Sequence, residues 1–198
     1  MFVSFEGVDG SGKSTQAALL AEWLRGRGRT VVTVREPGGT PLGEEVRRLV
    51  LHGDEMTPWA EAALFAAARA ELVERTIRPA LAGDADVVCD RYLDSSVAYQ
   101  GIARGLGAEP VLQLSLTVTG RLLPERTFVV LLDPQEARRR AGDEPDRIER
   151  ESAAFMQRVD DGYRTLAAAY PERIVAVDGT RDAETIAEEV REHVRALL

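Results

Sequence analysis

The sequence predicts an α/β fold in which a five-stranded parallel sheet is covered by helices on both faces. Five short runs of apolar or β-branched residues alternate along the chain with segments that carry apolar residues at three- and four-residue spacing. Each short run is bounded on at least one side by Gly, Pro or Asp. Alternating strands and helices form βαβ units, which build parallel sheets. Ligands of such sheets bind beyond the carboxyl ends of the strands.

The five strands are expected at residues 2–5, 30–34, 85–89, 127–132 and 173–177. The clearest helical patterns cover residues 13–27, 58–81, 146–169 and 183–197. Thr57 and Pro58 supply a cap and a first-turn proline for the second of these helices. The 198 residues contain no repeat or low-complexity linker, so we expect a single domain over residues 1–198.

The composition is that of a soluble protein. Charged residues make up 29% of the chain, and no apolar run approaches the ~18 residues that a membrane span needs. A strand-like run follows Met1 directly and Cys89 is the only cysteine, so we expect no signal peptide, no intramolecular disulfide and a cytoplasmic location. A net charge of −8 argues against non-specific nucleic-acid binding.

A glycine-rich motif follows the first expected strand and precedes the first expected helix. It matches G-x-x-x-x-G-K-[ST], whose backbone NH groups and helix N-terminus bind phosphate. Its lysine is the only one among 25 basic residues; a compact ammonium fits inside such a loop, whereas a planar guanidinium would crowd it. The expected nucleotide-binding residues are Gly7, Val8, Asp9, Gly10, Ser11, Gly12, Lys13, Ser14 and Thr15.

Two oxygen-bearing side chains are candidates for a Mg²⁺ site. The Ser14 hydroxyl is the usual magnesium ligand of this loop, and Asp90 ends the third expected strand, where a second carboxylate completes such sites. Alternatively, Asp90 is an ordinary polar residue at the end of a strand and binds no metal. A guanine-nucleotide switch is excluded, because its Asn-Lys-x-Asp motif needs an asparagine and this chain has none.

Several ordered motifs together resemble those of the bacterial thymidylate kinases. They are FEGVDGSGKST at residues 5–15, REPGGTPLGE at 35–44, LFAAARAELVERTIRPAL at 64–81, DRYLDSSVAYQG at 90–101 and DRIERES at 146–152. The resemblance implies a P-loop nucleoside monophosphate kinase fold with a short lid at about residues 134–150. It also implies a homodimer and the transfer of the γ-phosphoryl group of Mg²⁺-bound ATP to dTMP. The acceptor phosphate is already largely a dianion at neutral pH, so the reaction needs no general base.

The resemblance also assigns roles in the acceptor site. It implies that Arg91 grips the dTMP phosphate, Phe65 stacks on thymine and Arg69 donates to the base O4 atom. Tyr99 would crowd the 2′ position of the sugar, and Asp9 would lie near the sugar and phosphate. Without the resemblance, Phe65 as a core residue and Arg69 as a solvated charge are the simpler interpretations. Further residues expected in this pocket are Glu36, Ser95, Ser96 and Gln100.

The family's bacterial members supply a catalytic arginine from the lid, which implies Arg140 or Arg139 in this chain. Arg147 is a further candidate for the catalytic arginine; alternatively, it pairs with Asp146 or Glu149. The arginine run at 138–140 is alternatively interpreted as a solvated basic helix face. The lid is short, with Gly142 and Asp143 where further basic residues would be expected. Two alternatives stay open: a kinase of this fold for another nucleoside monophosphate or deoxynucleoside, and an ATP-binding protein without transfer activity.

Overall fold

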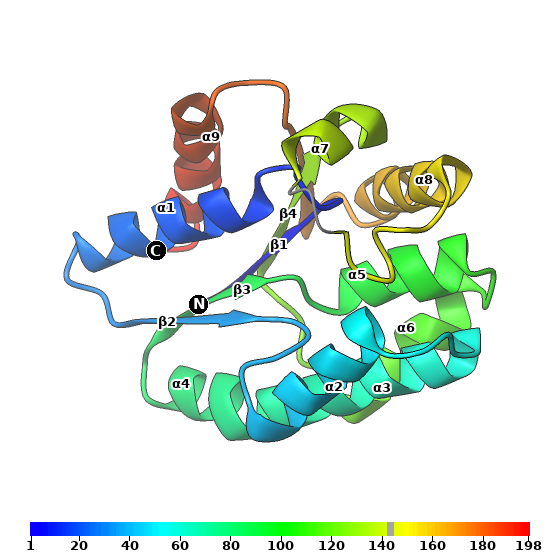
Figure 1. Ribbon diagram of the computed structural model, residues 1–198. Helices are drawn as coiled ribbons and strands as arrows, with labels where there is room; N and C mark the ends of the chain where they lie inside the picture. The colour runs from blue at the N-terminus through cyan, green and yellow to red at the C-terminus, as the bar shows by residue number, and fades with distance from the viewer. Residues whose placement is uncertain (142–144) are drawn as a thin grey trace.

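The computed structural model describes residues 1–141 and 145–198 and has the predicted α/β architecture (Figure 1). Its five strands form one parallel sheet in the order β2-β3-β1-β4-β5. All five predicted strands are present; they are Phe2–Glu6 (β1), Val31–Arg35 (β2), Asp86–Asp90 (β3), Arg126–Leu131 (β4) and Ile174–Asp178 (β5).

Helices connect the strands and cover the sheet. They are Lys13–Arg25 (α1), Pro41–His52 (α2), Pro58–Leu72 (α3), Val73–Ile77 (η1), Arg78–Ala82 (α4), Leu93–Ser96 (α5), Val97–Ala103 (η2), Ala108–Val118 (α6), Pro134–Arg140 (α7), Ala153–Ala169 (α8) and Ala183–Arg195 (α9). Within the described residues, no helix has both the length and the apolar character needed to cross a membrane.

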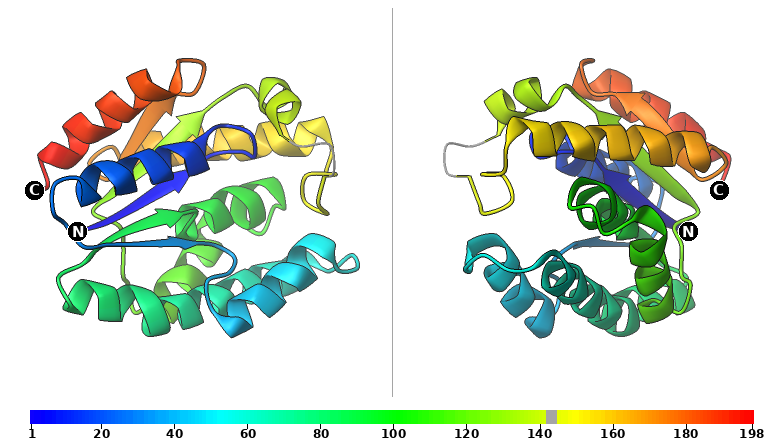
Figure 2. Two further views of the ribbon diagram at one scale, coloured as in Figure 1. Left: turned by 60° about the vertical axis from the view of Figure 1, so that its left-hand side comes forward. Right: turned by 90° about the vertical axis from the view of Figure 1, so that its right-hand side faces the viewer.

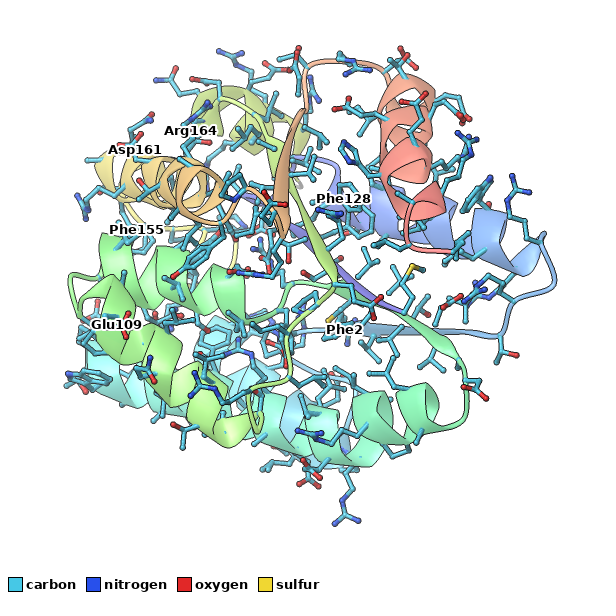
Figure 3. The ribbon with its side chains drawn as sticks, turned by 180° about the vertical axis from the view of Figure 1, so that it is seen from behind. Phe2, Glu109, Phe128, Phe155, Asp161 and Arg164 are labelled. Carbon is cyan, nitrogen blue, oxygen red and sulfur yellow. The ribbon has the colours of Figure 1, made fainter. Side chains whose placement is uncertain are left out.

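The sheet is buried on both faces, as a parallel sheet requires. Helices α1 and α9 pack side by side on one face, where Phe128 of β4 lies among their apolar side chains (Figures 2 and 3). Helix α8 and the η2 segment lie on the other side, with Phe155 of α8 next to Tyr99 of η2. In β1 the side chains alternate, so Val3 and Phe5 join the first core, whereas Phe2 lies in a separate core cluster with Leu72 and Tyr92.

Two helical predictions need correction. The segment predicted as one helix over 146–169 becomes helical only at Ala153, because the Ser152 side chain caps the helix there by accepting from the NH of Phe155. Thr57 is the residue before α3 as predicted, but its side chain makes no capping hydrogen bond. Helices α2, α5, α6 and α7 and the η2 segment were not among the predicted helices.

Candidate active site

The sheet topology brings two motifs of the sequence together. β1 and β3 are neighbours, with Phe5 paired with Asp90 in the parallel register. The glycine-rich loop therefore leaves the sheet beside the segment that begins at Arg91. This crevice, where consecutive connections leave to opposite sides of the sheet, is the position at which α/β folds bind ligands.

The loop has the conformation that its glycines predict. Gly12 lies in the left-handed region with φ 98° directly before α1, which begins at Lys13. Gly10 has φ 82°, and a Cβ at this position would lie 2.0 Å from the carbonyl oxygen of Ala137 in α7. Helix α7 therefore packs directly on the loop, which leaves no room for a side chain at position 10.

Asp9 lies between two cations. Its Oδ1 atom accepts a hydrogen bond from Nζ of Lys13 at 2.9 Å and another from Nη2 of Arg91 at 2.7 Å. Burial raises the pKa of the Asp9 carboxyl, but the charges of Arg91 and Lys13 outweigh burial and hold that pKa below its usual range. Two cations and one anion leave a local positive charge, which favours binding of phosphate.

The two candidate magnesium ligands also meet. The Ser14 hydroxyl donates to Oδ2 of Asp90 at 2.5 Å. The other carboxylate oxygen, Oδ1, is buried and has no hydrogen-bond partner in the described part of the chain. A hydroxyl and an unsatisfied carboxylate oxygen fit Mg²⁺, which needs few protein ligands when nucleotide phosphates and water supply the rest. Residues 1–141 and 145–198 hold no cluster of three or more His, Cys, Asp or Glu suited to a metal.

One cavity collects every residue of the expected acceptor set. Its walls also include residues that the sequence did not indicate: Pro37, Arg47, Leu51, Asp146 and Ile148. Two buried oxygens of this set, Oε1 of Glu36 and the hydroxyl of Tyr99, have no hydrogen-bond partner among the described residues. Unpaired polar atoms in a cavity wall are available to a ligand or to water.

Arg69 is a buried arginine, not a solvated one. It is 1% exposed, and its Nε donates to Glu36 at 2.8 Å. Nη1 donates to the Ser115 hydroxyl, and Nη2 donates to the Ser96 hydroxyl and the carbonyl of Tyr92. Four of its five N–H groups are thus used to hold the guanidinium in place, which leaves the second N–H of Nη1 for a ligand.

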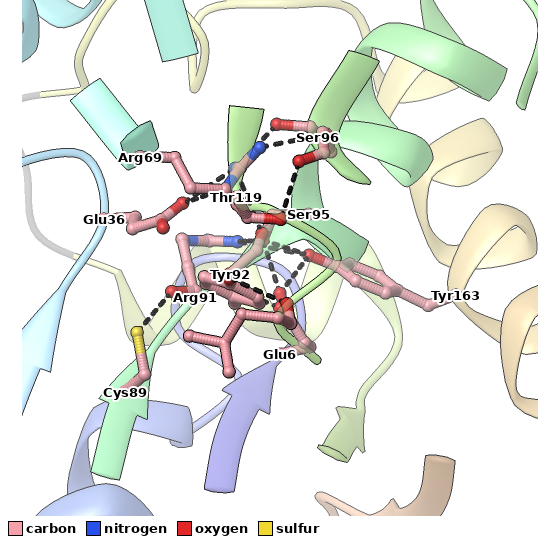
Figure 4. Close-up of polar contacts among 12 residues, drawn as sticks. Glu6, Glu36, Arg69, Cys89, Arg91, Tyr92, Ser95, Ser96, Thr119 and Tyr163 are labelled. Carbon is pink, nitrogen blue, oxygen red and sulfur yellow. Dashed lines mark hydrogen bonds and ion pairs between the residues drawn. The ribbon is translucent and has the colours of Figure 1, made fainter. Parts of the chain in front are cut away.

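Arg91 is held by a network behind the cavity that the sequence did not reveal (Figure 4). Its Nη1 donates to the hydroxyls of Ser95 and Tyr163, at 3.1 and 3.2 Å. Beneath them the buried Glu6 carboxyl group accepts from Ser95 at 2.5 Å and from the Tyr92 NH at 2.8 Å. Arg91 has φ 69°, an uncommon conformation for a side chain with Cβ that is typical of functional sites.

The arginines of α7 lie in different places. Arg139 and Arg140 both pair with Glu136, and Nη1 of Arg140 also donates to the carbonyl of Gly179. Arg138 donates to the carbonyl of Glu149 and lines a second cavity, which Val8 and Asp9 of the loop also line. Gly142 and Asp143 lie outside the described residues.

One sequence interpretation outside the cavities is wrong. Arg147 pairs with neither Asp146 nor Glu149; it donates to the carbonyl of Val50 and to Glu61. A single sequence carries no sign of these long-range partners.

The profile of the family described as thymidylate kinase matches residues 5–190. The chain belongs to the thymidylate kinase family. The thymidylate kinase of Symbiobacterium thermophilum is 49% identical over 201 residues, covering 100% of this chain and 94% of that protein. The enzyme of Gloeobacter violaceus is 50% identical over 203 residues, with 100% and 96% covered. The crystal structure of thymidylate kinase from Ehrlichia chaffeensis matches with a TM-score of 0.82 at 34% identity, with 98% of each chain covered. These full-length matches confirm the predicted fold of a nucleoside monophosphate kinase.

Proposed function

We propose that this thymidylate kinase transfers the γ-phosphoryl group of ATP to dTMP, giving dTDP and ADP, as a step of dTTP synthesis for DNA. The observation that carries the proposal is one cavity, next to the phosphate loop, that contains every residue expected to bind dTMP. Family membership over the whole chain supports the same activity.

Catalysis here rests on positioning and on neutralising charge. The dTMP phosphate is largely dianionic at neutral pH and attacks without a general base. Arg91 is preorganised to bind this phosphate, since Asp9, Ser95 and Tyr163 fix its guanidinium. Arg47 lines the same cavity and supplies a second positive charge there. Lys13 and the NH groups of residues 7–15 bind the ATP phosphates.

The Ser14 hydroxyl and the Asp90 carboxylate, which lie within hydrogen-bond distance of each other, would hold the Mg²⁺ ion of the nucleotide. When bound, the ion would neutralise charge on the donor phosphates.

The base is selected by two residues of α3. Phe65 and Arg69 are four residues apart and share a helix face in the cavity wall. Phe65 stacks on thymine, and the N–H of Arg69 that is not used inside the protein donates to O4. Cytosine presents an amino group in place of O4, so two donors would meet.

An arginine of α7 supplies further positive charge during transfer. Arg140 and Arg139 are our candidates, and each must leave Glu136 to reach the phosphates. We expect Arg140→Ala to lower kcat by about 10³-fold, since an arginine on the transferring phosphate contributes that much. Arg139→Ala and Arg138→Ala are measured for comparison. If Arg139→Ala and Arg140→Ala both kept full activity, the catalytic role would be assigned to Arg138.

Three further proposals follow. We infer that it works in the cytoplasm, where ATP is abundant and where the free, buried thiol of Cys89 stays reduced. We also infer that it forms a homodimer, as the family resemblance implies. The lid, at about residues 134–150, limits hydrolysis of ATP by excluding water.

The decisive test is ADP release from Mg·ATP with dTMP, dUMP, dCMP, dGMP, AMP, UMP and thymidine as acceptors. We expect strong turnover with dTMP, weaker turnover with dUMP and almost none with the others. Preference for another acceptor would overturn the roles of Phe65, Arg69 and Tyr99. Tight ATP binding without any turnover would overturn the proposed activity.

A further inference from the structure

Glu61 is a buried carboxylate on the same helix as the two base-selecting residues. It lies four residues before Phe65 and eight before Arg69, and it is 1% exposed. Side chains at this spacing lie on one helix face. Its Oε1 atom accepts a hydrogen bond from Nε2 of Gln100 at 2.9 Å. Nothing in the sequence or the family motifs indicated a role for this carboxylate.

Two arginines keep Glu61 ionised. Its Oε2 atom accepts from Nη2 of Arg104 at 3.1 Å and from Nη2 of Arg147 at 2.6 Å. Burial raises the pKa of the Glu61 carboxyl, but the hydrogen bonds from Arg104, Gln100 and Arg147 outweigh burial and place the pKa below its ordinary value. An ionised carboxylate has no proton to donate, so every group that faces it must be a donor.

This requirement determines the orientation of the Gln100 amide. An amide has a donor end and an acceptor end, and the donor end must face Glu61. Gln100 is 2% exposed and lines the acceptor cavity together with Phe65 and Arg69. The described residues provide no hydrogen-bond donor to its Oε1 atom. The carbonyl end of the amide is therefore available to a ligand in the cavity.

We infer that Glu61 is a positioning residue for base selection: it orients the Gln100 amide so that Oε1 accepts the N3–H of thymine. This inference rests on the proposed function, because it assumes that the cavity binds dTMP. Thymine has a donor at N3, whereas cytosine has a lone pair there. Cytosine would thus place its N3 lone pair against the Gln100 carbonyl oxygen and its amino group against Arg69. A cytosine base with two mismatched hydrogen-bond contacts is discriminated against more strongly than one with a single mismatch.

The test is the ratio of kcat/KM for dTMP to that for dCMP in Glu61→Gln. A neutral amide at position 61 can donate as well as accept, so the Gln100 amide is free to turn its NH₂ end toward the cavity. We expect the dTMP to dCMP ratio to fall about 10- to 100-fold, in line with the cost of one mismatched buried hydrogen bond. Both acceptors are assayed on one preparation, so loss of folded enzyme cancels from the ratio.

The dTMP to dUMP ratio separates positioning from general loosening. Uracil has the same N3–H and O4 as thymine, so this ratio should not change in Glu61→Gln. A fall in both ratios, or an unchanged dTMP to dCMP ratio, would overturn the inference. Phosphorylation of dTMP by the wild-type enzyme is measured first. If the wild-type enzyme failed to phosphorylate dTMP, the proposed function, and not the role of Glu61, would be wrong.

Three further variants complete the design. Glu71→Gln makes the same change on the same helix in an ion pair with Arg75 and should leave both ratios unchanged. Arg147→Gln removes one arginine from Glu61 but leaves Arg104 and Gln100 bound to it, so the dTMP to dCMP ratio should be retained. Gln100→Met removes the carbonyl oxygen; if Glu61→Gln is insoluble, unchanged discrimination against dCMP in Gln100→Met would overturn the inference.

Discussion

Lys13 shows why one position retained lysine in a chain that otherwise uses arginine. Its side chain is 6% exposed, and its ammonium lies 2.9 Å from Asp9 inside the loop. Burial and the neighbouring Arg91 guanidinium both lower the pKa of Lys13. The site therefore holds a small cation in a space that other charged groups already surround.

Lys13→Arg should lower kcat by about 10² to 10³-fold, because the larger guanidinium displaces the loop NH groups from the phosphates. Steady-state kinetics with dTMP measure the loss. Arg25→Lys, an exchange of the same two residue types in the exposed last turn of α1, is the control and should keep full activity. Activity of Lys13→Arg within threefold of wild type would contradict this account.

Glu6 links the active site to the pH dependence of stability. Burial, and then the charge of Asp94, raise the pKa of Glu6 from 4.5 to about 8, although hydrogen bonds from Ser95 and the Tyr92 NH and the charge of Arg91 oppose the rise. Between these pH values the folded chain retains a proton that the unfolded chain releases. The free energy of unfolding therefore falls as pH rises through this window.

Glu6→Gln should flatten this pH dependence, because the amide does not titrate. Urea unfolding of both proteins at several pH values between about 5 and about 8 measures the slopes. A wild-type slope that is equally steep in the variant would show that another group binds the proton.

At the scale of elements, the contact between α7 and the phosphate loop determines which side chain position 10 can carry. The carbonyl of Ala137 occupies the space that a side chain at position 10 would need. The short loop and the lid helix therefore form one unit, and an arginine at position 10 could not be accommodated in this arrangement. Gly10 as a motif glycine was visible in the sequence, but its helical neighbour was not.

Gly10→Ala should displace α7 and lower kcat by about 10²-fold, the cost of a misplacement near 1 Å. Gly28→Ala is a matched control. Gly28 has φ 79°, close to the 82° of Gly10, but a Cβ there meets nothing within 4 Å. Both variants share the backbone strain, so only the clash with α7 separates them. Equal kcat values in the two variants would contradict this reading.

At the scale of the molecule, every strand was predicted, but helices α2, α5, α6 and α7 and the η2 segment were not. Strand runs are short, apolar and bounded by turn residues, so they are visible locally. Helix α2 was missed because it follows a proline- and glycine-containing segment, and α6 because Pro110 in its first turn resembles a turn signal. Helix α2 contributes Arg47 and Leu51 to the cavity, so the missed element explains two missed site residues.

The proposed homodimer is a prediction about the whole molecule. Helix α2 leaves Leu42 and Leu49 more than a third exposed, at 47% and 39%, and seven residues apart on one face. A second copy of the chain would cover such a face. Light scattering at micromolar concentration should give twice the 21.7 kDa of one chain. A monomer under these conditions would contradict the proposal.

The sequence by itself determined the fold class and displayed the phosphate-loop motif with Lys13; the family motifs in it predict the acceptor set. These features depend on local periodicity or on contiguous motifs, which a single chain displays directly. The tertiary structure alone decided the partners of the buried acidic side chains: Glu6 behind Arg91, Glu36 on Arg69, and Glu61 on Gln100. Each of these contacts joins residues more than thirty positions apart. Only the packing of the sheet and its helices decides which distant donor satisfies each buried carboxylate.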